Sequence, residues 1–102
     1  MGIICEPAEG HTPKEIGLGV LRLIKSEAKG KDLSHGAMKL DGRDAYYIEA
    51  SLPKNGTTMF LYEVCCVTRD QDVTITITGL LSNKAAILKK FKASLKSFVW
   101  QN

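Results

Sequence analysis

Two neighbouring cysteines and a row of lysines are the side chains of this sequence best suited to chemistry. Cys65 and Cys66 adjoin in a run that reads as a strand, where neighbours point to opposite faces, so we do not expect them to bond to each other. With Cys5 they make an odd count of three, which does not fit a secreted disulfide framework and favours a reducing compartment. We expect both to be small buried residues. The alternative is a reactive thiol, which needs a depressed pKa and the approach of His35.

Charge is distributed unevenly along the chain. Residues 73–102 hold five lysines and no acidic residue, whereas residues 1–72 hold nine basic and eleven acidic residues. Lys89, Lys92 and Lys96 lie three and four positions apart, so on a helix they form a basic stripe that can meet phosphates or an acidic partner. A solvated face that keeps the helix soluble is the plainer interpretation, and an anionic partner is the alternative.

Recognised catalytic and metal-binding patterns are missing from the sequence. His11 and His35 have no cysteine or carboxylate at a recognised ligand spacing, and neither C-x-x-C nor H-E-x-x-H occurs. We therefore expect no metal, no cofactor and no enzyme active site. A net charge of +3 is too small to indicate nucleic acid, and the aromatic residues match no RNA-recognition signature, so nucleic acid is not an expected partner.

Length and composition indicate one folded domain over residues 1–102. The chain has a mass of 11.2 kDa, is 44% hydrophobic and 25% charged, and so resembles an average globular protein. No apolar run approaches the roughly 20 residues that cross a bilayer, and the N-terminus lacks the features of a signal peptide. We expect a cytoplasmic protein, or an envelope-associated one if a leader precedes this sequence.

The sharpest local signal is a helix start. Thr12, Pro13 and Glu15 form a capping box with proline at the first helical position. Apolar residues then recur at helical spacing, and Gly30 offers a left-handed stop. The pattern predicts an amphipathic helix from about Pro13 to Lys29.

The hydrophobic period changes from 3.6 to 2 after this helix, which predicts a four-stranded antiparallel meander. Asp41-Gly42 is a two-residue hairpin signal, and Pro53 to Gly56 predicts the next turn. The third strand is apolar on both faces, so we expect it to be central and covered on both sides. The expected strands are Leu33 to Leu40, Arg43 to Leu52, Thr57 to Thr68 and Val73 to Thr78.

A second helix, capped by Ser82 or Asn83, is expected to close the chain and cover the sheet with its apolar stripe. The predicted fold class is α+β, with the order α-β-β-β-β-α. The residues expected to be mostly buried are Phe60, Tyr62, Val64, Ile75, Ile77, Leu88, Phe91, Leu95 and Phe98.

Three segments together resemble the PsbP/DcrB-like superfamily. They are the strand start Leu40 to Tyr47, the run Tyr62 to Leu80 with its Thr-Arg-Asp-Gln-Asp turn, and the closing Phe91 to Phe98, which ends in Leu-Lys-Ser-Phe. The resemblance implies an antiparallel sheet with flanking helices, and it covers about two-thirds of the chain. The superfamily includes a photosystem accessory protein, bacterial envelope proteins and a eukaryotic Ran-binding factor, so it implies no shared catalytic centre.

This chain departs from the superfamily at its start, where only Gly2 to Glu6 precede the first helix, so we expect the family's N-terminal strands to be lacking. The weak strand Leu33 to Leu40 would then be an open edge, and we expect a homodimer, joined either edge to edge or across an uncovered sheet face. We expect a non-enzymatic accessory domain that binds a protein. The alternatives are a small ligand-binding protein or thiol enzyme with a pocket near Cys65 and Cys66, and an anionic-surface binder through the lysine stripe.

Overall fold

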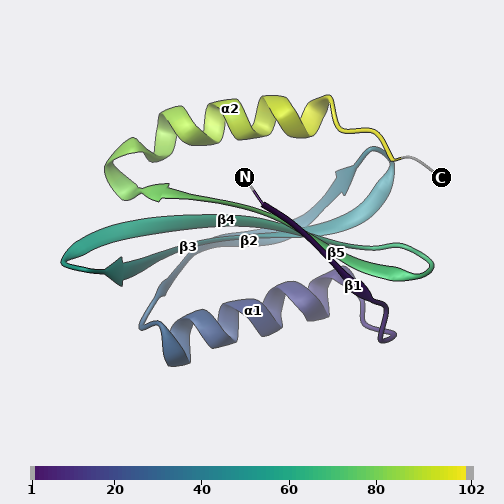
Figure 1. The fold of residues 1–102 in the computed structure, drawn as a ribbon, viewed down its shortest axis with the longest axis horizontal. Helices are drawn as coiled ribbons and strands as arrows, with labels where there is room; N and C mark the ends of the chain where they lie inside the picture. The colour runs from purple at the N-terminus through teal and green to yellow at the C-terminus, as the bar shows by residue number, and fades with distance from the viewer. Residues whose placement is uncertain (1, 101–102) are drawn as a thin grey trace.

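The computed structural model describes residues 2–100 and shows a five-stranded antiparallel sheet between two helices. The helices α1 and α2 lie on opposite faces of the sheet (Figure 1). The strand order is β1-β5-β4-β3-β2, so β1 and β2 form the two edges. The elements are β1 (Gly2–Pro7), α1 (Pro13–Glu27), β2 (Lys31–Leu40), β3 (Arg43–Lys54), β4 (Thr57–Val67), β5 (Gln71–Leu80), a 3₁₀ turn (Leu81–Asn83) and α2 (Lys84–Lys96).

The predicted order α-β-β-β-β-α and the four-stranded sheet were wrong, because the N-terminal segment is itself a strand. β1 pairs antiparallel with β5, with Ile3 opposite Ile75 and Cys5 opposite Val73. Isoleucine favours the extended backbone that this pairing needs. The class α+β and the meander of β2 to β5 are confirmed.

Both predicted hairpins form, and each turns on two residues with left-handed backbone. Asp41 and Gly42 have φ of 46° and 80°, and Asn55 and Gly56 have φ of 52° and 81°. Such a pair matches the right-handed twist of the flanking strands. Because the second turn needs only Asn55 and Gly56, β3 continues to Lys54 and is longer than the pattern predicted.

The predicted capping box of α1 is confirmed. The Thr12 hydroxyl accepts from the Glu15 backbone N–H at 3.2 Å, and the Glu15 carboxylate accepts from the Thr12 N–H at 2.9 Å. The helix ends at Glu27, and the left-handed residue is Lys29, with φ of 53°, rather than Gly30. Gly30 is required for a different reason, since a Cβ there would lie 2.9 Å from the Ser51 carbonyl oxygen.

The second helix begins at Lys84 with Asn83 at its N-cap, but no side chain caps it. The 3₁₀ turn Leu81–Asn83 runs directly into α2 and leaves Asn83 at φ −103° and ψ 9°, away from the extended backbone of a capping residue. The predicted helix is therefore confirmed, whereas the predicted capping by Ser82 or Asn83 is not.

The core has two layers, one on each side of the sheet. β4 is central, as predicted, and its residues 62–66 are all buried. Between α1 and the sheet, Leu21 and Ile24 of the helix pack against Tyr46, Ile48 and Ala50 of β3. On the α2 side of the sheet, Ile77, Leu95 and Phe98 are partly buried against a buried cluster. Its members predicted from the sequence are Phe60, Tyr62, Val64, Ile75, Leu88 and Phe91.

Candidate functional site

A groove of about 560 Å³ runs between the C-terminal half of α2 and the strands β2 and β3. It forms because α2 packs over β4 and β5, where Phe91 meets the Tyr62 ring edge-on at 5.5 Å, and leaves the same face of β2 and β3 uncovered. The lining residues are Ser34, Met38, Lys39, Leu40, Asp41, Tyr47, Glu49, Tyr62, Lys92, Leu95 and Lys96.

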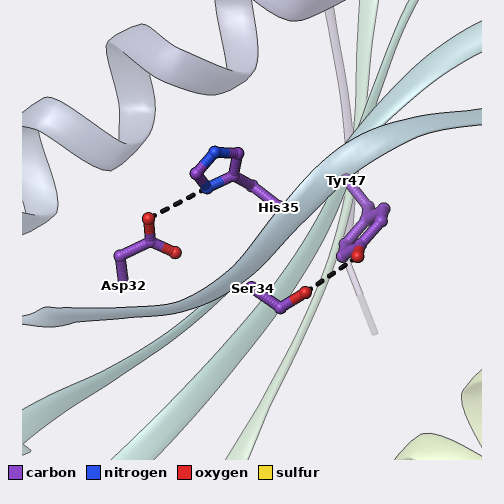
Figure 2. Close-up of polar contacts among 4 residues, drawn as sticks. All are labelled: Asp32, Ser34, His35 and Tyr47. Atoms are coloured by element: carbon purple, nitrogen blue, oxygen red, sulfur yellow. Dashed lines mark hydrogen bonds and ion pairs between the residues drawn. The ribbon is translucent and has the colours of Figure 1, made fainter.

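Two tyrosines form the floor of the groove. The rings of Tyr47 and Tyr62 stack in parallel, with centroids 5.6 Å apart and an angle of 8° between their planes. Tyr47 lies across the edge strand because Gly36 opposite it has no side chain, and a Cβ there would be 3.2 Å from the ring. The Tyr47 hydroxyl is then held by the Ser34 hydroxyl at 2.8 Å (Figure 2).

The helix side of the groove carries cations. Lys92 and Lys96 are exposed on α2, and the Lys92 ammonium lies 5.8 Å above the centre of the Tyr62 ring. Beneath them, the buried Glu49 carboxylate forms an ion pair with Lys84 at 2.6 Å. The acidic group in the floor is thus already neutralised.

The C-terminal segment is bound beside the groove, at two of its lining residues, Leu40 and Asp41. The Trp100 backbone N–H donates to the Asp41 carboxylate at 2.9 Å, and its indole N–H donates to the Leu40 carbonyl at 2.8 Å. Phe98 packs edge-on against the Trp100 ring at 4.9 Å, and the Arg43 guanidinium lies 5.1 Å from the ring centre. The chain after α2 is therefore fastened to the β2–β3 hairpin (Figure 1).

The Tyr62 hydroxyl in the groove is unsuited to acid–base chemistry at neutral pH. Burial, reinforced by Tyr47 and Glu49, raises the pKa of Tyr62 to about 12. A phenol with that pKa stays protonated at neutral pH and cannot act as a base.

Asp32, Ser34 and His35 are the residue types of a hydrolase triad, but the sheet separates them. The Asp32 carboxylate meets the His35 imidazole at 2.9 Å on the α1 side, whereas Ser34 points to the other face and bonds to Tyr47 (Figure 2). This contact between His35 and a carboxylate was not anticipated from the sequence. A bulge between Asp32 and Ser34 puts positions 32 and 35 on one face, which a regular strand would not do. With no contact between serine and histidine, the set lacks the geometry of a nucleophile and its base.

The candidate thiols are buried on opposite faces of β4, as neighbours in a strand should be. Burial raises the pKa of Cys65 to about 12 and that of Cys66 to about 11. His35 stacks on Tyr46, the residue paired with Cys65 across β3 and β4, so β3 separates the imidazole from the thiol. Such thiols are poor nucleophiles, and neither lines the groove.

Two of the three lysines in the stripe face the groove, and the third does not. Lys89, Lys92 and Lys96 are all exposed on α2, but only Lys92 and Lys96 line the groove.

Among residues 2–100, no three His, Cys, Asp or Glu side chains come together as a metal site would require. In the same part of the chain, neither helix has the length and apolar character needed to span a membrane.

Sequence reasoning did not single out the tyrosine floor, although one signal was available. The Asn55-Gly56 turn sets the register of β3 and β4, and counting back from it places Glu49 opposite Tyr62. Tyr47 then becomes the diagonal neighbour of Tyr62 on the same face. The groove itself depends on how far α2 extends across the sheet, which no local pattern reveals.

These features define an α/β/α sandwich on an antiparallel sheet, with an open groove beside one helix. This fold is shared with two solved structures, one of them a PsbP, in agreement with the fold that the resemblance implied. A protein of unknown function from Pseudomonas aeruginosa, PA94, matches with a TM-score of 0.79 and 12% identity over 99% of this chain and 84% of its own. The cyanobacterial PsbP (CyanoP) from Synechocystis sp. PCC 6803 matches with a TM-score of 0.72 and 12% identity, over 97% of this chain and 66% of its own.

At the level of sequence, no described protein family and no curated protein matches the chain. The likeness to the two solved structures therefore concerns the fold.

Proposed function

We propose that this chain is a non-enzymatic accessory domain that acts by binding, and that the groove beside α2 is its binding site. The observation that carries the proposal is the tyrosine floor, where Gly36 makes room for Tyr47 and Ser34 holds its hydroxyl. The groove has the usual features of a small-molecule site. Its volume is about 560 Å³, its walls are apolar and aromatic, and a few polar groups lie among them.

The ionisable groups around the groove support binding over catalysis. Glu49 is held by Lys84, Tyr62 stays protonated, and the thiols lie outside the groove with raised pKa values. Neither Tyr62 nor either thiol has a pKa near neutral pH, which is what general acid or base catalysis needs.

Methionine methyl groups offer a direct test of binding in the groove. Met38 lines the groove, whereas Met59, on the central strand, does not. In a chain labelled with ¹³C at the methionine methyls, a set of neutral, cationic and anionic compounds is titrated, and the Met38 signal should shift while the Met59 signal stays. If no compound moves the Met38 signal, or if both signals move together, the groove is not a binding site.

A second candidate is the protein partner expected from the sequence, and the edge strand β1 favours it. All six residues of β1 are exposed, and Ile3 and Ile4 are 54% and 56% exposed. A strand that is paired on one side and carries apolar side chains can accept a strand from another chain. For the compartment of the protein, we propose the cytoplasm, with the cell envelope as the alternative.

A further inference from the structure

The groove has an uneven charge once its internal ion pairs are taken into account. Of its acidic groups, Glu49 pairs with Lys84, whereas Asp41 accepts from the Trp100 backbone N–H and keeps its negative charge. In contrast, Lys92 and Lys96 form no ion pair with any described residue from 2 to 100. Two ammonium groups therefore face the groove against one carboxylate without an ion pair, that of Asp41, and the remaining charge is positive.

The same geometry disfavours a cationic ligand. The face of an aromatic ring is the usual place for a ligand ammonium group, but Lys92 already lies over Tyr62 at 5.8 Å. A ligand cation would have to displace Lys92 and would meet Lys96 nearby on the same helix face. An anionic group meets both lysines favourably.

The rest of the lining favours an apolar body behind that anionic group. Met38, Leu40 and Leu95 supply aliphatic surface beside the tyrosine rings. The hydroxyls of Ser34 and Tyr47 bond to each other and so have less capacity to bind a polar ligand. Apolar surface of this kind gains free energy when a ligand removes it from water.

The size of the groove favours a small molecule over a peptide chain. Its volume of about 560 Å³ is within the range of pockets that hold small organic ligands.

We propose that the groove binds an amphipathic organic anion, with its charged head at Lys92 and Lys96 and its apolar body against Met38, Leu95 and the tyrosine floor. The inference rests on the proposed function of the groove and adds the chemical class of its ligand.

Calorimetric titration with octanoate tests the proposal, and three matched probes isolate each part of it. Acetate has the charge without the body, 1-octanol has the body without the charge, and octylammonium has the opposite charge. We expect saturable binding of octanoate at one site and much weaker binding of the other three.

Two double variants test the lysines. Lys92→Gln with Lys96→Gln should weaken octanoate binding by about tenfold, since each lysine loses a charge-assisted contact. Lys89→Gln with Lys90→Gln makes the same change of charge on exposed positions of the same helix outside the groove, and should leave affinity within about twofold.

Equal losses in the two double variants would overturn the proposal, because they would show an effect of net charge alone. Tighter binding of octylammonium or of 1-octanol than of octanoate would overturn it as well. A hexaglutamate peptide serves as a further probe, an acidic chain without an apolar body, and its tighter binding would have the same consequence. If such a probe shifts the Met38 methyl signal and octanoate does not, the binding role stands and the ligand class is wrong. If no probe shifts it, both proposals fail.

Discussion

Glu63 is an acidic residue enclosed in the α1 side of the sheet, and its environment favours the protonated form. It is 8% exposed; one carboxylate oxygen accepts from the Thr76 hydroxyl at 2.8 Å, and the other has no partner among the described residues. Burial raises the pKa of Glu63 above its ordinary value of 4.5, and the Thr76 hydrogen bond opposes only part of that shift.

This shift predicts how stability depends on pH. Because the folded chain holds the proton more tightly than the unfolded chain, the contribution of Glu63 is fully present below pH 4.5 and is lost as pH rises through the folded pKa. Glu63→Gln keeps an oxygen for Thr76 and removes the titration. We expect the variant to unfold at higher denaturant concentration than the wild type at pH 7, and the difference to shrink towards pH 4.

The exposed Glu9→Gln is the matched control, since it removes the same charge from a position that folding does not bury. Chemical denaturation from pH 4 to pH 8 provides the measurement. A Glu63→Gln chain that gains no more stability between pH 4 and pH 7 than the Glu9→Gln chain would contradict the expectation.

Among the predicted site residues, burial of the two cysteines could be inferred from their place in an apolar strand, but the partner of His35 could not. The Asp32–His35 contact needs the bulge at Leu33, and nothing in the local sequence marks an extra residue in this weakly patterned strand. The same limit applies to the tyrosine floor, which depends on the absent side chain of Gly36 in a neighbouring strand.

Substitution of two glycines in α1 distinguishes the effect of helix propensity on stability from the effect of packing. A Cβ at Gly19 would meet nothing within 4 Å, whereas one at Gly17 would lie 2.8 Å from the buried Tyr46 ring. We expect Gly19→Ala to raise the free energy of unfolding by about 0.5–1 kcal/mol. Gly17→Ala should lower it by about 1–3 kcal/mol, because the added methyl group would force the buried Tyr46 ring to move. Urea titrations of both variants check the pair, and changes of the same sign would show that α1 does not pack on Tyr46 as described.

α2 covers the sheet mainly through Phe91, which is 2% exposed and packs edge-on against Tyr62. Phe91→Ala should cost about 3–5 kcal/mol by leaving a cavity between helix and sheet. The exposed neighbour Lys90→Ala should change stability by less than about 0.5 kcal/mol. Equilibrium denaturation measures both, and a loss below about 1 kcal/mol for Phe91→Ala would mean that this face of α2 is not the cover of the sheet.

Elements with local signals were predictable from the sequence. The capping box at Thr12, the Asp41-Gly42 and Asn55-Gly56 turns and the apolar stripe of α2 each act within a few residues of one another. β1 has no such signal, since its six residues are all exposed and show no alternation, and its partner β5 lies more than sixty residues further along the chain.

At the scale of the whole molecule, the sheet has two open edges. β2 is an edge, as expected, and its Lys39 forms an ion pair with Asp44 of the neighbouring strand, while β1 presents Ile3 and Ile4. The homodimer expected from the sequence stays a prediction, now with two edges able to form it.

Light scattering at micromolar concentration tests self-association. A mass near twice 11.2 kDa is the expected result. Ile4→Lys on β1 and Ala37→Lys on β2 place a charge on one exposed edge each, and the variant that returns the mass to that of a monomer identifies the edge that pairs. A wild-type mass that stays near 11.2 kDa as concentration rises rejects the dimer.

The central claim is that the groove between α2 and the β2–β3 hairpin holds an amphipathic anion. A crystal structure of the chain grown with octanoate tests it most directly. The predicted result is a carboxylate between the ammonium groups of Lys92 and Lys96, with the alkyl chain lying along Met38 and Leu95 above the tyrosine floor. Octanoate bound on the exposed isoleucines of β1, or a groove left empty at saturating octanoate, would contradict the claim.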